Sequence, residues 1–275
     1  MKILGIANAE TSSAVLFDGP KLIAAASEER FTRKKMDEAF PHNSIEYVLD
    51  EAGIMENEID VISYSWSKGF PENALVTQLD RLSKLTEDEY KIFFERLQSE
   101  QSRDFPKRKE FWQTIKNEYN FENATLEDFY HHEAHALSAS MPSPFDKCAV
   151  LTCDGRGDYE SLTFSIYDKS KNSLKKLYSS SSSDSLGFFY GRITGLLGFT
   201  PCRHEGKITG LAAYGDPNKA IHLMREMIVY SEGHIRSNMG DLYRPFYTNY
   251  SEKLINEINK FSKEDIAAAA QFHLE

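Results

Sequence analysis

The chain has 275 residues, 41% of them hydrophobic and 27% charged, so it is long enough to bury one or two sizeable cores. Its 42 acidic residues outnumber its 32 basic residues and give a net charge of -10. An acidic surface repels phosphate at long range, so neither nucleic acid nor an anionic membrane is expected as a partner. Any phosphate-binding site must therefore depend on a few nearby basic or backbone N–H groups and not on the overall charge of the surface.

The sequence also favours a location in the cytoplasm. No apolar run reaches the length of a membrane span, and the first residues lack the basic-then-apolar pattern of a signal peptide. The three cysteines, Cys148, Cys153 and Cys202, are odd in number and show no metal-ligand pairing. Core thiols in a reducing compartment are the expected interpretation.

The amino-terminal region alternates short apolar runs with turns, a pattern typical of a strand meander. Asp18-Gly19 is a hairpin turn signal, and Gly53 is a helix stop. The predicted elements are strands at residues 3–7, 14–17, 22–26 and 61–66, and a helix from Asn43, its cap, to Ala52.

From about residue 68 to residue 123 the chain becomes dense in Glu, Lys, Asp and Arg. Apolar residues such as Leu79, Leu82 and Leu85 recur at helical spacing within this stretch. We therefore predict a charged helical insertion outside the central sheet, with its charges on a solvated face.

A second strand pattern starts near residue 148. It predicts strands at 148–153, 161–167 and 174–178, with turns at 154–158 and 168–172. This repeats the order of elements seen near residue 3, although not its sequence. The repeat predicts an α/β fold with two related lobes, residues 1–144 and 145–275, of the actin-like ATPase and sugar-kinase type, in which turns of both meanders hold phosphate.

The carboxy-terminal part, residues 217–275, is predicted to be mainly helical. A helical pattern at 266–274 continues to Glu275 without a cap or glycine stop. The expectation is that the second lobe is incomplete.

Three of the eight histidines lie in the run His131-His132-Glu133-Ala134-His135. In a helix, His131 and His135 share one face and can meet the same metal ion. Asp154, at the end of the next strand, is positioned to be a third ligand. The alternative is a polar helix start with hydrogen-bonded histidines, and the spacing alone leaves both open.

Glycines are concentrated in one stretch, with seven of the 15 lying between Gly187 and Gly215. Because glycine is unfavourable in helices, this density indicates close approach of the backbone to another element or to a ligand. Gly187, Gly191 and Gly195 line one helix face, for which tight packing and ligand contact are both open. The run from Glu205 to Gly210 combines two glycines with Lys207 at a helix start, which suits an anionic ligand.

A basic cluster follows the third strand, in the run Glu28-Glu29-Arg30-Phe31-Thr32-Arg33-Lys34-Lys35. Four cations within six residues are unusual on so acidic a chain. The run is either a solvated turn or a clamp that points one Lys or Arg at a phosphate-like group.

Together, in order and spacing, these motifs resemble the O-carbamoyltransferases of nodulation-factor and antibiotic biosynthesis. The resemblance spans nearly the whole chain except the charged insertion. The segments that carry it are Ser12-Ser13-Ala14 leading to Asp18-Gly19, the run Glu28 to Lys35, the run His131 to Ala136, the run Asp154 to Asp158, and the glycine-rich stretch with Tyr190-Gly191, Gly198-Phe199, Glu205-Gly206-Lys207 and Gly210 to Gly215.

The resemblance implies a two-lobed domain similar to the tRNA threonylcarbamoyl transferases, which binds carbamoyl-adenylate and a divalent metal ion, with iron ahead of zinc or manganese. It assigns Lys35 to the carbamoyl group. Glu10 lies where this chain departs from the family, and it is the second expected catalytic residue. The implied metal ligands are His131, His135 and Asp154. The implied nucleotide- and carbamoyl-binding residues are Ser12, Arg33, Asp154, Gly155, Arg156, Gly157, Asp158, Glu205, Gly206, Lys207 and Gly210.

In the family a separate carboxy-terminal domain makes carbamoyl-adenylate from carbamoyl phosphate and ATP, so these residues alone are expected to be inactive when given carbamoyl phosphate and ATP. The acceptor would be a small hydroxylated molecule. One departure concerns the first turn, where Ala9-Glu10 stands in place of the family's His-Asp. Either Glu10 replaces that histidine as base, or the acceptor differs.

The main alternative is a non-catalytic metal- and nucleotide-binding module of the same fold. A kinase of this fold is a weaker alternative, because the first-lobe turns contain no convincing aspartate base.

Overall fold

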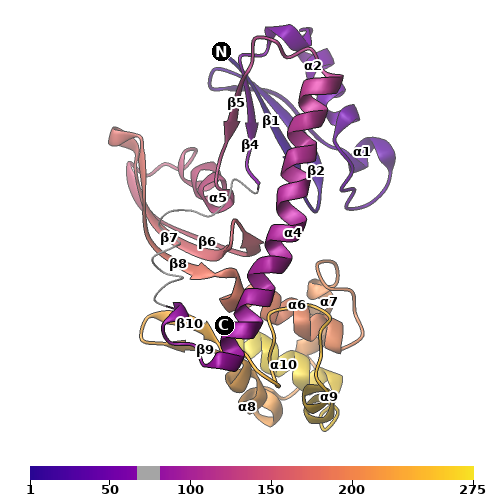
Figure 1. Cartoon of the computed structure of the whole chain (residues 1–275), viewed down its shortest axis with the longest axis vertical. Helices are drawn as coiled ribbons and strands as arrows, with labels where there is room; N and C mark the ends of the chain where they lie inside the picture. The colour runs from indigo at the N-terminus through magenta and orange to yellow at the C-terminus, as the bar shows by residue number, and fades with distance from the viewer. Residues whose placement is uncertain (67–80) are drawn as a thin grey trace. The chain divides into compact units, whose positions relative to one another are not determined.

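The computed structural model describes residues 1–66 and 81–275 (Figure 1). Contacts divide the chain into two compact units. One comprises Gln101–His135 with the described residues of Met1–Gly69, and the other comprises Ala136–Glu275 with the described residues of Phe70–Glu100. The predicted lobe boundary at residues 144 and 145 stays a prediction. Among the described residues, no helix combines the length and hydropathy that crossing a bilayer requires.

The first unit contains a five-stranded sheet with the strand order β3-β2-β1-β4-β5. β1 pairs antiparallel with β2, and β2 with β3, which is the predicted first meander. β4 runs parallel to β1, and β5 runs parallel to β4. The strands are β1 (Lys2–Asn8), β2 (Ser12–Asp18), β3 (Lys21–Ser27), β4 (Val61–Tyr64) and β5 (Thr125–Asp128).

One face of this sheet forms the core of the first unit. Alternate side chains such as Leu4, Leu16 and Ile62 are buried on it, because successive strand residues point to opposite faces. α2 (His42–Ala52) contributes Ile45 and Val48 to the same core. α2 begins one residue before the predicted cap Asn43, and it ends at Gly53 as predicted. The shorter helices are α1 (Glu29–Thr32) and η1 (Glu56–Glu58).

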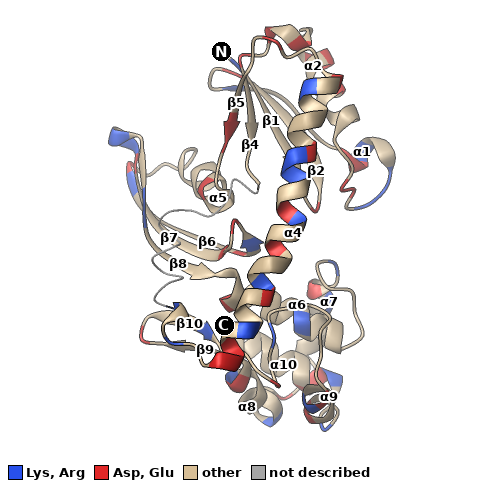
Figure 2. Cartoon of the chain, viewed as in Figure 1, with Lys and Arg blue, Asp and Glu red and all other residues tan. Residues whose placement is uncertain are grey.

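The predicted charged insertion contains α4 (Glu87–Glu118), and Pro106 lies inside this helix. Acidic and basic residues occur along its whole length (Figure 2). The predicted solvated charged face has exceptions, because Arg96 and Glu100 are 4% and 1% exposed. Apolar residues of α4, including Phe93 and Phe111, are also buried. Leu79 and the other insertion residues up to 80 lie outside the described part of the chain.

The second unit contains an antiparallel three-stranded sheet, β6-β7-β8, which confirms the predicted α/β fold with two meanders. The turn predicted at 154–158 is wrong, because β6 continues to Gly157 with a register shift after Cys153. The chain turns instead at Asp158 and Tyr159, whose φ angles of 49° and 68° supply the left-handed geometry of a tight hairpin. The strands are β6 (Lys147–Gly157), β7 (Glu160–Asp168) and β8 (Ser173–Ser181), with η2 (Lys169–Lys171) between the last two and η3 (Ser182–Asp184) after β8.

Five helices pack into the core of the second unit. Ser185, Asp216, Ser251 and Ser262 cap four of them by accepting a hydrogen bond from a backbone N–H of the first turn. The core includes fully buried alanines of the last helix. The helices are α6 (Leu186–Leu196), α7 (Glu205–Ala212), α8 (Pro217–Met227), α9 (Glu252–Ile258) and α10 (Lys263–Leu274).

Residues 217–275, predicted to be mainly helical, contain α8, α9 and α10 and also one hairpin that was not predicted. β9 (Ile228–Ser231) and β10 (His234–Ser237) pair antiparallel. Glu232 and Gly233 connect them with φ angles of 54° and 81°, which are the left-handed values that a two-residue hairpin turn requires.

Candidate metal and ligand site

The three predicted histidines lie on α5 (His131–Ser140), which follows β5 directly. Ala136 and Leu137 of this helix pack with Val150 of β6 and Tyr167 of β7. His131 and His135 are one turn apart on the same face, as a 3.6-residue repeat requires. His132 is out of phase with them and is 2% exposed.

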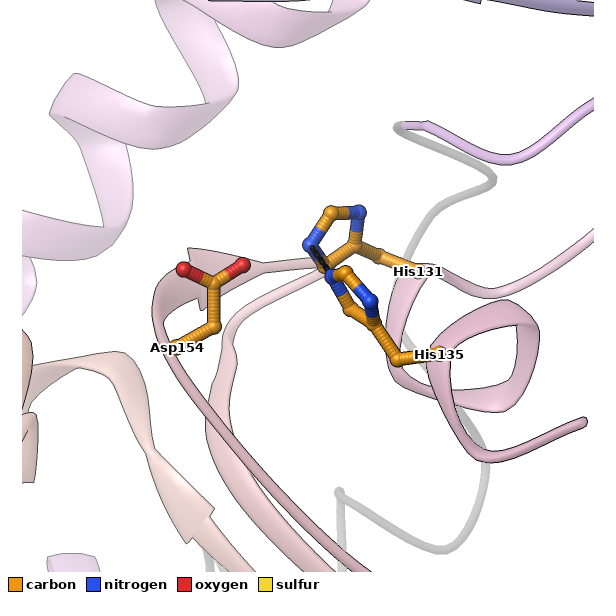
Figure 3. Close-up of side chains that lie close together, drawn as sticks. All are labelled: His131, His135 and Asp154. Atoms are coloured by element: carbon orange, nitrogen blue, oxygen red, sulfur yellow. Dashed lines mark hydrogen bonds between the residues drawn. The ribbon is translucent and has the colours of Figure 1, made fainter. Parts of the chain in front are cut away.

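The rings of His131 and His135 lie next to each other, with centroids 4.5 Å apart. Their Nε2 atoms are 3.0 Å apart, and the two rings are perpendicular (Figure 3). The ring of Trp66 meets the His131 ring edge-on, with centroids 4.6 Å apart. The nitrogen separation is compatible with a hydrogen bond between the imidazoles, so the alternative of hydrogen-bonded histidines stays open.

Asp154 of β6 completes a possible donor set with these histidines. One ligand atom from each of His131, His135 and Asp154 lies within 4.8 Å of the other two (Figure 3). The Asp154 Oδ1 atom also accepts a 2.6 Å hydrogen bond from the Gly155 backbone N–H. Two nitrogens bound to one ion at about 2.1 Å and at right angles would be about 3 Å apart. The donor chemistry and spacing therefore fit a divalent transition metal ion.

Glu28, the first residue of the run from Glu28 to Lys35, binds the amino-terminal end of α2. Glu28 is buried, and its carboxylate accepts hydrogen bonds from the backbone N–H groups of Asn43 and Ser44. The side chains of the same two residues donate to it as well, Ser44 Oγ at 2.7 Å. Burial raises the pKa of Glu28, but the hydrogen bonds outweigh burial and leave it lowered. Glu28 therefore caps the positive end of α2.

The loop that carries Lys35 is tied to the β1–β2 turn that carries Glu10. Asn8 Nδ2 donates to the Ser12 hydroxyl at 3.1 Å and to the Glu38 carbonyl at 3.0 Å. The Ser12 backbone N–H donates to the Asp37 carbonyl. Ser12 is buried within this network.

Three other predicted residues of this region are exposed. Lys35 and Glu10 both lie on the surface. Arg33 is exposed at the end of α1, where its φ is 59°. Their assigned roles stay predictions.

Arg156, predicted to bind nucleotide, lies inside the second unit. It is 7% exposed, and its Nη1 atom is 3.8 Å from Glu100 Oε2. Arg96 Nε donates to the other oxygen of Glu100 at 2.9 Å. The sequence shows the i, i+4 spacing of Arg96 and Glu100 but gives no sign of their burial. The neighbouring Gly157 and Asp158 are buried too.

The structure shows tight packing at the three glycines of α6. A Cβ on Gly187 would lie 2.8 Å from the Gly155 Cα, and one on Gly191 would lie 2.5 Å from Tyr247 Cε1. A Cβ on Gly195 would collide with the Tyr250 hydroxyl. Packing is thus sufficient to explain these positions.

The glycines of α7 differ from those of α6. No atom of the described residues lies within 4 Å of a Cβ placed on Gly206 or Gly210. Both glycines and Lys207 are exposed. Glu205, at the start of the helix, accepts a 2.7 Å hydrogen bond from the Cys202 backbone N–H. The exposed surface of α7 therefore combines backbone that no side chain covers, at Gly206 and Gly210, with the ammonium group of Lys207.

Comparison with known proteins places these features in a family. Residues 2–275 match the family model described as Carbamoyltransferase N-terminus. The chain is 34% identical over 277 residues to the uncharacterized protein sll1178 of Synechocystis, covering 94% of this chain and 41% of that one. It is 32% identical over 209 residues to nodulation protein NolNO of Sinorhizobium fredii, covering 74% of this chain and 28% of that one.

The chain thus spans less than half the length of these curated relatives. Among solved structures, YeaZ from Pseudomonas aeruginosa is similar with a TM-score of 0.34 and 11% identity, over 66% of this chain and 68% of that one. The family model covers all but the first residue of the sequence. The chain therefore belongs to the carbamoyltransferase N-terminus family.

Proposed function

We propose that the chain is the metal- and nucleotide-binding part of an O-carbamoyltransferase. It binds carbamoyl-adenylate and a divalent metal ion, and it transfers the carbamoyl group to a hydroxyl of a small molecule. The observation that supports this best is the set of donor atoms of His131, His135 and Asp154 within 4.8 Å of one another, in a chain of this family.

His131, His135 and Asp154 would hold iron, zinc or manganese, because imidazole and carboxylate suit all three. Such an ion supplies Lewis-acid polarisation of a carbonyl oxygen when it is bound. Three protein ligands leave coordination positions for water or substrate, as in catalytic rather than structural sites.

The transfer step needs a group that accepts a proton. In the proposal, the Glu10 carboxylate takes the proton of the acceptor hydroxyl while the hydroxyl oxygen bonds to the carbamoyl carbon. The bond from that carbon to the phosphate oxygen breaks, and AMP leaves. The Lys35 ammonium donates a hydrogen bond to the carbamoyl group.

The nucleotide is proposed to lie against α7 and the end of β6. The exposed backbone at Gly206 and Gly210, together with Lys207, supports binding of an anion at the start of a helix. In the longer relatives, a further domain would make carbamoyl-adenylate from carbamoyl phosphate and ATP.

The proposal is tested by supplying chemically prepared carbamoyl-adenylate to the chain with ferrous, manganous or zinc ions and a panel of hydroxylated acceptors. AMP release that needs both metal and acceptor is the expected result, and Lys35→Ala should reduce it at least tenfold. Lys34→Ala is the matched control, since the Lys34 side chain is paired with Asp37.

Ala9 favours one other function, because it leaves the first turn without the histidine found in the family. A metal- and nucleotide-binding module without catalysis would bind carbamoyl-adenylate tightly but release no AMP above the uncatalysed rate. That result would contradict the proposed carbamoyl transfer but would support the proposed binding site.

A further inference from the structure

The segment from Tyr243 to Tyr250, which follows the β9–β10 hairpin, is anchored on α6. Arg192 of α6 is buried, and its Nη1 atom donates a 2.7 Å hydrogen bond to the Phe246 carbonyl. The Arg192 guanidinium also lies 4.9 Å from the Tyr250 ring centroid. The Tyr250 hydroxyl in turn donates to the Tyr247 carbonyl. The backbone on both sides of Tyr247 is therefore held in place.

The ring of Tyr247 occupies space that a glycine leaves open. Because a Cβ on Gly191 would lie 2.5 Å from Tyr247 Cε1, only glycine at 191 admits the ring at this position. The ring also packs against Phe188, with centroids 4.7 Å apart. Glycine lowers the stability of a helix relative to alanine. At position 191 this cost is offset by the space that glycine leaves for the Tyr247 ring.

The hydroxyl of Tyr247 lies beside the end of β6, one of the two segments to which the proposed function assigns the nucleotide. This hydroxyl lies 3.3 Å from the position of a Cβ on Gly155, directly after Asp154. The Cβ position of Gly191, which the Tyr247 ring approaches, is also 3.6 Å from Glu205 Oε1 at the start of α7. The sequence gives no sign that Tyr247 approaches Gly155, because 92 residues separate the two.

We infer that Tyr247 is a ligand-binding residue whose hydroxyl donates a hydrogen bond to the phosphate of the bound adenylate. This inference rests on the proposed function. Phe188 and Gly191 pack against the ring, so the polar end of the side chain is the part suited to ligand contact. A phenol is a good donor to an anionic oxygen, and Tyr247 is only partly buried.

The test compares Tyr247→Phe with the wild type in calorimetric titrations of the whole chain with AMP and with adenosine. Phenylalanine keeps the ring packing and removes only the hydroxyl. Tyr214→Phe is the matched control, because Tyr214 is an exposed tyrosine of the same unit. Unchanged thermal unfolding of both variants would show that the fold is intact.

We expect Tyr247→Phe to weaken AMP binding about tenfold and to leave adenosine binding and the Tyr214→Phe control unchanged. AMP affinity equal to that of the wild type would overturn the inference while leaving the proposed function standing. Equal losses for AMP and adenosine would also overturn it, because the contact would not be to the phosphate. If the wild type itself does not bind AMP, the proposed nucleotide site fails and the inference fails with it.

Discussion

His131 and His135 lie one helical turn apart on the same face of α5, with their Nε2 atoms 3.0 Å apart. Two donors at this separation serve equally well as a hydrogen-bonded pair or as two ligands of one ion. A metal titration distinguishes the two, because a hydrogen-bonded pair needs no third residue, whereas a metal site also needs Asp154.

We expect His131→Ala, His135→Ala and Asp154→Ala each to weaken the binding of ferrous, manganous or zinc ions by at least tenfold. Glu133→Gln, on the same helix and between the two histidines, should bind as the wild type does. Calorimetric or competition titrations would measure the affinities. Wild-type affinity in all three alanine variants would show that the histidines are only structural.

Glu28→Gln should destabilise the chain by about 1 to 2 kcal/mol, a typical loss when a helix cap is removed. The amide has one acceptor oxygen and no charge, while the carboxylate accepts four hydrogen bonds from Asn43 and Ser44. Urea denaturation measures the change. Glu46→Gln, an exposed substitution on α2, should have no effect of that size, and equal midpoints for the two variants would contradict the capping role.

Glu100→Gln should cost more, about 3 kcal/mol, because it leaves the buried guanidinium groups of Arg96 and Arg156 without their shared carboxylate. The loss should appear as a lower midpoint of chemical denaturation. Glu95→Gln is an exposed control on the same helix. A loss no larger than in the control would mean that the buried cluster contributes little to stability.

The free energy of unfolding should fall as the pH drops from about 4 to about 2, because Asp265 becomes protonated in this range. Hydrogen bonds from the Asp216 backbone, Lys219 and Ser262 lower the pKa of Asp265 from 3.8 to about 2. A carboxyl whose pKa is lower in the folded state stabilises the fold above its unfolded pKa and loses that contribution as the pH falls through the folded value. Asp265→Asn should therefore flatten this part of the stability curve, as measured by thermal unfolding from pH 6 to pH 2. A curve of unchanged slope would exclude Asp265 as the cause.

The two meanders could be predicted because their information is local. Alternating apolar residues and short turns specify β1 to β3 and the start of β6 to β8 without help from distant residues. The β9–β10 hairpin also had a local signal in Gly233, but the helical pattern around it obscured that signal. The sequence predicted a turn at 154–158, a few residues before the observed turn at Asp158 and Tyr159, because tyrosine rarely adopts a positive φ.

In the candidate site, too, local features could be predicted from the sequence and long-range contacts could not. The spacing of His131 and His135 is a property of one helix, so the sequence predicts their common face. The burial of Arg156 and Glu100 and the approach of Tyr247 to Gly155 depend on pairs of residues more than 50 positions apart. No periodicity in the sequence encodes such contacts, which follow only from the tertiary packing.

Pro106 divides the backbone hydrogen bonds of α4 into two stretches. Proline has no N–H, so residue 106 cannot donate to the carbonyl four positions earlier, and its ring crowds that carbonyl. The hydrogen-bond ladder is interrupted there, six residues after Glu100. In hydrogen–deuterium exchange, the amides of α4 should therefore open as two separate blocks with different protection, one before and one after residue 106.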